Sequence, residues 1–164
     1  MAAPYSPSTA FRSGRWLGTA LACTLVLVLA MLPPFVGPGW REALLHGFHG
    51  VCHQMPGRSF QVDGVPFALC HRCFGIATGL VLGVGAFPFL RWMRMPRPAA
   101  VLFVTALPMT VDWALGASGL WANTPVSRVL TGAVFGLAAG WVLARAVVSS
   151  PSPEPPPLQP SLVS

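Results

Sequence analysis

The sequence contains no lysine and has little charge of either sign. Charged residues make up 9% of its 164 residues, against about 25% in a typical soluble domain. The ten basic residues are all arginine. They form no basic cluster with interleaved aromatic side chains, so we expect no nucleic-acid partner. Hydrophobic residues reach 54%, and this composition indicates a protein whose partner is the lipid bilayer.

Long polar stretches are also scarce, because four apolar windows fill most of the chain. They are residues 16–36, 74–90, 99–120 and 128–148, and a membrane-spanning helix needs about 20 such residues. No A-x-A cleavage site follows the first window before Pro33 and Pro34, so we interpret it as an uncleaved span. We expect an all-α polytopic membrane protein with four transmembrane helices in residues 16–148. Residues 1–15 and the Pro-rich tail 149–164 are expected to be disordered.

The arginines are unevenly distributed about these windows. Six would lie on one side of the membrane, namely Arg12, Arg15, Arg91, Arg94, Arg97 and Arg145. Four would lie on the other side, namely Arg41, Arg58, Arg72 and Arg128. By the positive-inside rule both termini are cytoplasmic, and the protein is placed in the inner (cytoplasmic) membrane with residues 51–75 facing outward.

Glycine recurs every four residues in the second and fourth windows. The two series are Gly75, Gly79 and Gly83, and Gly132, Gly136 and Gly140. Such GxxxG series let helix backbones approach closely. We predict that the two helices pack in parallel through these faces, although glycine is also simply common in membrane helices. The same faces could instead join two copies in a homo-oligomer.

Cysteine is rare, yet three of the four cysteines lie in VCHQMPGRSFQVDGVPFALCHRCFG, residues 51–75. Cys70 and Cys73 form a C-x-x-C motif where this loop becomes the second span, and Cys52 and His53 lie upstream. The spacing suits zinc or another soft metal ion, and equally a redox dithiol or a structural disulfide. A four-ligand site would use Cys70, Cys73, one of Cys52 or His53, and one further residue. Cys23, in an apolar span, is interpreted as a packed residue.

Acidic residues are absent from the four windows apart from Asp112. A carboxylate at membrane depth normally faces the bundle interior and has a partner. Asp112 is either the ion-pair partner of Arg72 or Arg128, or a metal ligand or proton carrier. A metal ion would satisfy thiolates and a carboxylate together. We therefore predict that Asp112 joins the cysteines in one polar site in the outer half of the bundle.

The segment between the first two spans predicts an amphipathic surface helix over residues 40–53. At about 100° per residue, Glu42, His46, His49 and His53 fall within one polar stripe. We favour simple exposure to water for His46 and His49, and a functional role for His53 because it adjoins Cys52. Downstream, Arg58 and Arg72 are well placed to hold a phosphate or carboxylate by forked hydrogen bonds, or to anchor the membrane interface.

Two motifs together resemble a known family. CHQMPGRSF at residues 52–60, followed by CHRCFGIATG at 70–79, is similar to the pattern of the DUF2085 family of uncharacterised prokaryotic membrane proteins. The similarity continues with Asp112 in an apolar run and with Asn123, Arg128 and Gly132, and it covers roughly residues 40–148. His71 departs from the small residue expected there. The resemblance implies a multi-span protein with a shared polar site, and it supplies no reaction.

Three functions are compatible with these residues. The leading hypothesis is a zinc site that activates water for hydrolysis of a membrane-associated substrate, with Asp112, Arg58, Arg72 and Arg128 as the candidate catalytic residues. The second is a membrane thiol–disulfide oxidoreductase that uses Cys70 and Cys73, although residues 121–127 lack the second cysteine pair of such proteins. The third is a small transporter or assembly factor with Asp112 in a polar path.

Overall fold

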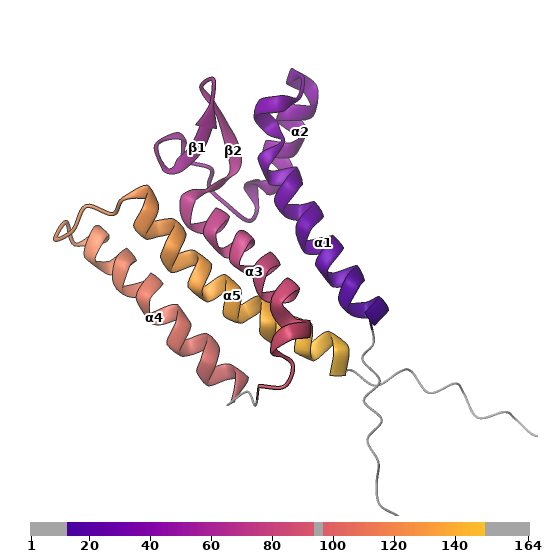
Figure 1. The fold of residues 1–164 in the computed structure, drawn as a ribbon. Helices are drawn as coiled ribbons and strands as arrows, with labels where there is room; N and C mark the ends of the chain where they lie inside the picture. Colours follow the sequence, from indigo (N-terminus) through magenta and orange to yellow (C-terminus); the bar gives the residue numbers. More distant parts are fainter. Residues whose placement is uncertain (1–12, 94–96, 150–164) are drawn as a thin grey trace, which may run out of the picture.

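Helices dominate the computed structural model, which describes residues 13–93 and 97–149 (Figure 1). Four of the described helices are long and apolar enough to cross a membrane: α1 (Ser13–Met31), α3 (His71–Leu90), α4 (Pro98–Ala117) and α5 (Pro125–Ser149). The prediction of four spans is confirmed. Helix α1 ends before Pro33 and Pro34, because proline cannot donate the backbone hydrogen bond that would continue it. The expected disordered ends, apart from residues 13–15 and 149, lie outside the described residues.

The segment between α1 and α3 contains a helix and a β-hairpin. Short 3-10 turns (Pro33–Phe35 and Pro56–Arg58) flank α2 (Pro38–His49). The predicted helix is present, but it ends four residues before the predicted boundary at residue 53, so His53 lies outside it. Strands β1 (Ser59–Val62) and β2 (Val65–Cys70) pair antiparallel, and neither strand was predicted. Asp63 and Gly64 connect them with φ angles of +50° and +76°. Two successive residues with positive φ are typical of the two-residue hairpin turn that Asp-Gly favours.

Helices α3 and α5 pack in parallel through their glycine series, as predicted. A Cβ atom added at Gly75, Gly79 or Gly83 would overlap the backbone of α5, and one added at Gly132, Gly136 or Gly140 would overlap the backbone of α3. Residue numbers in the facing pairs rise together, so the two helices run in the same direction. These faces are filled within one chain and are therefore closed to a second copy. The expected glycine-mediated homo-oligomer loses the surface on which it depended.

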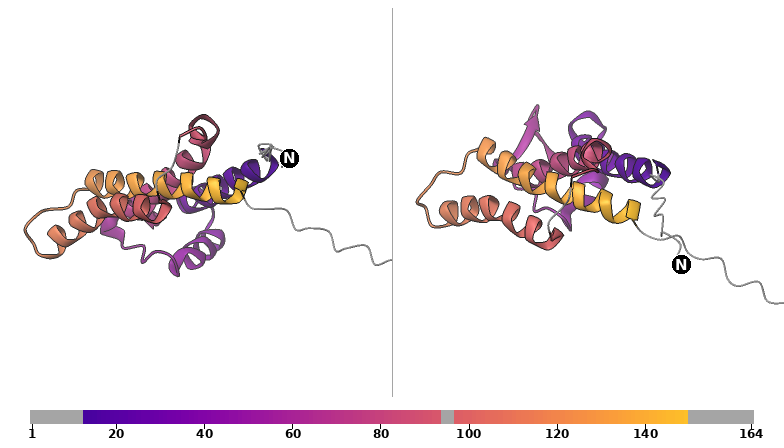
Figure 2. Two further views of the ribbon diagram at one scale, coloured as in Figure 1. Left: turned by 90° about the horizontal axis from the view of Figure 1, so that it is seen from below. Right: turned by 60° about the horizontal axis from the view of Figure 1, so that its bottom comes forward.

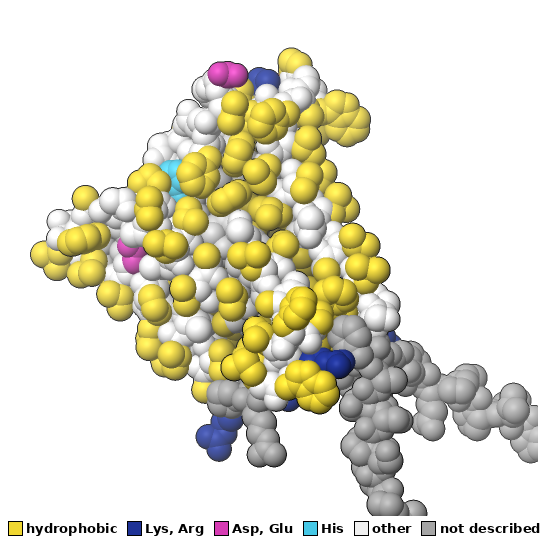
Figure 3. Space-filling model, viewed as in Figure 1, with side chains coloured by type: hydrophobic (Ala, Val, Ile, Leu, Met, Phe, Trp, Pro, Cys, Tyr) yellow, Lys and Arg dark blue, Asp and Glu magenta, His cyan; other side chains and the backbone are white. Residues whose placement is uncertain are grey.

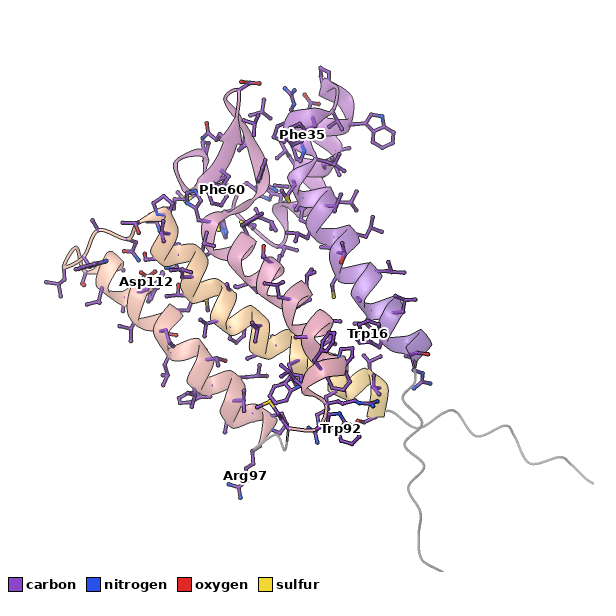
Figure 4. The ribbon with its side chains drawn as sticks, in the orientation of Figure 1. Trp16, Phe35, Phe60, Trp92, Arg97 and Asp112 are labelled. Carbon is purple, nitrogen blue, oxygen red and sulfur yellow. The ribbon has the colours of Figure 1, made fainter. Side chains whose placement is uncertain are left out.

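Aromatic side chains attach the hairpin to the start of α3. The ring of Phe60 on β1 lies 4.5 Å from that of His71 and 5.3 Å from that of Phe74, edge to face in both cases. Phe67 on β2 completes the group, at 6.2 Å from Phe74. Figure 4 shows Phe60 where the hairpin meets the helix. This packing fixes the position of Cys70, the last residue of β2.

One end of the helical bundle carries the β-hairpin and is here called the hairpin end (Figure 1). It contains α2, the hairpin, the starts of α3 and α5 and the end of α4. In the turned views of Figure 2, α4 and α5 remain side by side. Figure 3 shows hydrophobic side chains over the middle of one face, with most charged side chains near its two ends. This distribution matches a protein whose middle lies in lipid.

Candidate functional site

Three thiols meet at the hairpin end of α3. The sulfur atoms of Cys52, Cys70 and Cys73 all lie within 4.8 Å of one another. Cys52 comes from the loop after α2, Cys70 from the end of β2 and Cys73 from the first turn of α3. Cys52 is 3% exposed and belongs to a hydrophobic cluster with Ala30 and Leu69. All four cysteines, including Cys23, are free thiols.

Local backbone geometry brings the distant Cys52 to the C-x-x-C motif. The backbone N–H of Cys52 donates to the carbonyl of Phe48 at 2.9 Å, which closes a turn at the end of α2. Gln54 then reverses the chain with a φ of +48°, and its side chain donates to the carbonyl of Leu45 at 2.7 Å. Finally the backbone N–H of Cys70 donates to the Cys52 sulfur at 3.2 Å. This hydrogen bond joins the loop after α2 to the end of β2 and holds Cys52 beside Cys70.

The pKa of Cys70, which lies just before the spanning helix α3, is shifted by the neighbouring thiols. A hydrogen bond from the Cys73 thiol lowers the pKa of Cys70 well below the ordinary thiol value. Burial opposes this effect, while hydrogen bonds from the Cys73 backbone and the Cys52 thiol add to it. Cys70 is thus the thiol of this group best suited to be a thiolate near neutral pH. Such a thiolate is both a metal ligand and a nucleophile.

The structure brings together three of the ligands predicted for one site, with Cys52 as the member chosen from the pair Cys52 or His53. The described residues contain a group of three thiols to which neither His53 nor Asp112 belongs. His53 is exposed, because the backbone that turns Cys52 inward turns its neighbour outward. Asp112 instead forms an ion pair with Arg72. The polar residues therefore form two sites and not one.

The second site surrounds Asp112, which is 9% exposed on α4 and is labelled in Figure 4. Its carboxylate accepts hydrogen bonds from Arg72 and, at 2.9 Å, from the side-chain amide of Asn123. The same amide donates to the backbone carbonyl of Asp112. Asn123 fits because Gly116 has no side chain; a Cβ there would overlap its amide group. The loop before α5 is thereby fixed to the end of α4.

The start of α3 separates two cavities of different character. An apolar cavity of about 530 Å³ lies between α1 and α3, and Cys23, Leu69 and Cys73 are among its lining residues. A smaller cavity of about 110 Å³ is lined mainly by polar groups of Arg58, Arg72, Asn123 and Arg128, together with Trp113, Gly116 and Ala117 of α4. The thiols thus border an apolar space, and the arginines border a polar one.

Comparison with known proteins identifies the family of this chain. A family model described as a predicted membrane protein, DUF2085, matches residues 52–142, more than half of the chain. The chain belongs to the DUF2085 family. It is also 37% identical over 89 residues to the uncharacterized protein MJ1492 of Methanocaldococcus jannaschii, which covers 52% of this chain and 56% of that protein. The aligned region thus spans about half of that relative. No solved structure matches the chain.

The DUF2085 match contains both sites and excludes α1 and α2. It begins at Cys52, the first of the three clustered thiols, and extends through the hairpin, α3 and α4 into α5. Asn123 belongs to the second site, but the sequence analysis gave it no role beyond its place in the family resemblance. The available signal was its place two residues before Pro125, where a span begins, and nine residues before Gly132. A side-chain amide at such a position needs a partner when it is buried.

Proposed function

We propose that this DUF2085 protein binds a thiophilic metal ion, most suitably zinc, through Cys52, Cys70 and Cys73. The observation that carries the proposal is the set of three sulfur atoms within 4.8 Å of one another. Zinc–thiolate bonds are about 2.3 Å long, so one ion can reach all three sulfurs after small side-chain rotations. The amide hydrogen bond to the Cys52 sulfur supports the same assignment, because metal-bound thiolates are stabilised by such donors.

Three protein ligands leave one coordination position for water or a substrate atom, as in catalytic zinc sites. Cys73 borders the apolar cavity between α1 and α3, which favours a ligand that arrives from the membrane. Hydrolysis of a membrane-associated substrate is the reaction class that fits this combination. Asp112 is a weak candidate for its general base, since its carboxylate is engaged by Arg72 and Asn123.

Metal analysis of the purified full chain in detergent tests the proposal. We expect about one zinc per chain, lost in the Cys52→Ser, Cys70→Ser and Cys73→Ser variants. Cys23→Ser is the matched control, because Cys23 borders the same cavity but does not belong to the three-thiol group. Equal metal content in all four variants, or none in the wild type after growth with zinc, would overturn the proposal.

A thiol–disulfide oxidoreductase is the second candidate, favoured by the lowered pKa of Cys70 beside Cys73. A third thiol, Cys52, lies beside these two, although a single thiol cannot form the second pair that such proteins use. Thiol counting under denaturation separates the two functions. A metal protein yields four free thiols after chelation without reductant, whereas a redox protein yields two and gains two more on reduction.

A further inference from the structure

Three arginines from three separate segments meet at the polar cavity of about 110 Å³. Arg58 ends the 3-10 turn before β1, Arg72 lies in the first turn of α3, and Arg128 lies in the first turn of α5. Arginines that only mark the ends of spans need no common location. Their convergence on one cavity therefore calls for a separate explanation.

The charge around this cavity is not balanced by the protein. Asp112 forms an ion pair with Arg72. Across residues 13–93 and 97–149, no hydrogen bond or ion pair engages the side chain of Arg58 or Arg128. Three guanidinium groups minus one carboxylate leave a local charge of +2. The parallel helices α3 and α5 both begin here, and their N-terminal dipoles add to the positive potential.

One buried donor beside the cavity also lacks an acceptor. The Nε atom of Arg72 is buried and has no hydrogen-bond partner among the described residues, although its Nη2 atom serves Asp112. Buried donors are almost always satisfied. A cavity needs about 10–15 Å³ to hold one water, so a cavity of about 110 Å³ has room for several waters or for one tetrahedral oxyanion.

We propose that Arg58, Arg72 and Arg128 form a binding site for a phosphate group, either the headgroup phosphate of a lipid or inorganic phosphate. Guanidinium groups bind phosphate oxygens through paired hydrogen bonds. A tetrahedral dianion offers oxygens in several directions to three arginines and matches the local charge of +2. Trp113, which also lines the cavity, is 60% exposed, as expected of an aromatic residue at the level of lipid head groups.

Binding to the full chain in a phosphate-free maltoside detergent tests this site with two probes. The first is inorganic phosphate, titrated by calorimetry, and the second is a short-chain phosphatidic acid, followed by native mass spectrometry. We expect one of the probes to bind with a stoichiometry of one. The Arg58→Gln and Arg128→Gln variants should each weaken it by about tenfold, since each removes a charge-assisted hydrogen-bonding group. These two arginines are chosen because Arg72 also holds the ion pair with Asp112.

Arg97→Gln provides the matched control, because it removes the same charge at the opposite end of the bundle, where Figure 4 shows Arg97 pointing away from the helices. Binding of inorganic phosphate identifies a soluble ligand, and binding of phosphatidic acid alone identifies a lipid. Either result with selective loss in the Arg58 and Arg128 variants supports the site. Binding of neither probe, or equal weakening by Arg97→Gln, overturns it.

Discussion

Arg72 lies between two clustered cysteines in the chain but serves a different site. Cys73 borders the apolar cavity on the α1 side of α3, while Arg72 forms an ion pair with Asp112 of α4 on the other side. Successive residues of a helix point about 100° apart, so a single turn can supply both sites. The CHRC sequence thus joins a thiol cluster and an arginine cavity through one helical turn.

Removing the carboxylate of Asp112 should lower the stability of the protein, because Arg72 would lose its ion-pair partner. In Asp112→Leu the guanidinium of Arg72, whose side chain is 21% exposed, loses its carboxylate partner. The amide of Asn123 loses one of its two acceptors on Asp112 and keeps the backbone carbonyl. Breaking a buried pair in this way costs about 3–5 kcal/mol. We expect unfolding of the purified protein in detergent to begin at a clearly lower denaturant concentration.

The double variant Arg72→Leu, Asp112→Leu is the control for this prediction. It removes both charges together, and replacement of a buried pair by apolar residues is often close to neutral. We therefore expect it to recover most of the lost stability. A double variant as unstable as Asp112→Leu would show that the carboxylate stabilises the fold through something other than Arg72.

Helices α3 and α5 pack closely because the glycines at their contact have no side chains. Gly79→Ala would place a Cβ against the backbone of Ala133 and Leu137 on α5. The helices must separate to admit it, and overpacking of this kind costs about 1–3 kcal/mol. Denaturant unfolding of the variant in detergent should show this loss of stability.

Gly85 provides a matched control in the same helix. A Cβ at Gly85 meets no atom within 4 Å, and alanine is a better helix former than glycine by about 1 kcal/mol. Gly85→Ala should therefore unfold at the same denaturant concentration as the wild type or a higher one. Equal destabilisation by Gly79→Ala and Gly85→Ala would contradict the close packing of α3 and α5.

The elements differ in how much of them the sequence predicts. The glycine pairing is predictable because a period of four places Gly75, Gly79 and Gly83 on one helix face. The hairpin is not, because β1 has four residues, β2 contains Pro66, and their register shifts between Ser59 and Gln61. Such short irregular strands resemble a loop in sequence, and packing against α3 determines their structure.

The sequence predicts the cysteines of the candidate site but does not decide the partner of Asp112. Cys70 and Cys73 are close by sequence, and the turn signals at Pro56 and Asp63 allow the chain to return from Cys52. The partner of Asp112 depends on which face α4 turns towards its neighbours, and the sequence of α4 has no polar stripe to reveal it. The sequence left Asp112 either as the ion-pair partner of Arg72 or Arg128, or as a metal ligand or proton carrier. The three-dimensional packing pairs it with Arg72.

At the scale of the whole molecule, both sites lie at one end of the bundle. The three-thiol group and the arginine cavity occupy the two sides of the start of α3, and the apolar cavity runs beside the thiols along α1 and α3. The opposite end carries four arginines among the described residues. Arg15 lies near the start of α1, Arg91 just after α3, Arg97 just before α4 and Arg145 near the end of α5.

This asymmetry predicts the orientation of the protein. Arginine-rich connections remain in the cytoplasm, so the end with Arg91 and Arg97 should be cytoplasmic and the hairpin end should face outward. Alkaline phosphatase is active only after export from the cytoplasm. Fused after Gly119, in the loop between α4 and α5, it should be active; fused after Arg97, before α4, it should be inactive. A reporter that folds only in the cytoplasm, fused at the same two positions, should give the complementary pattern. The opposite result from both reporters would place the thiols and the arginine cavity on the cytoplasmic side, where a reducing environment keeps cysteines free for metal binding and disfavours the oxidoreductase.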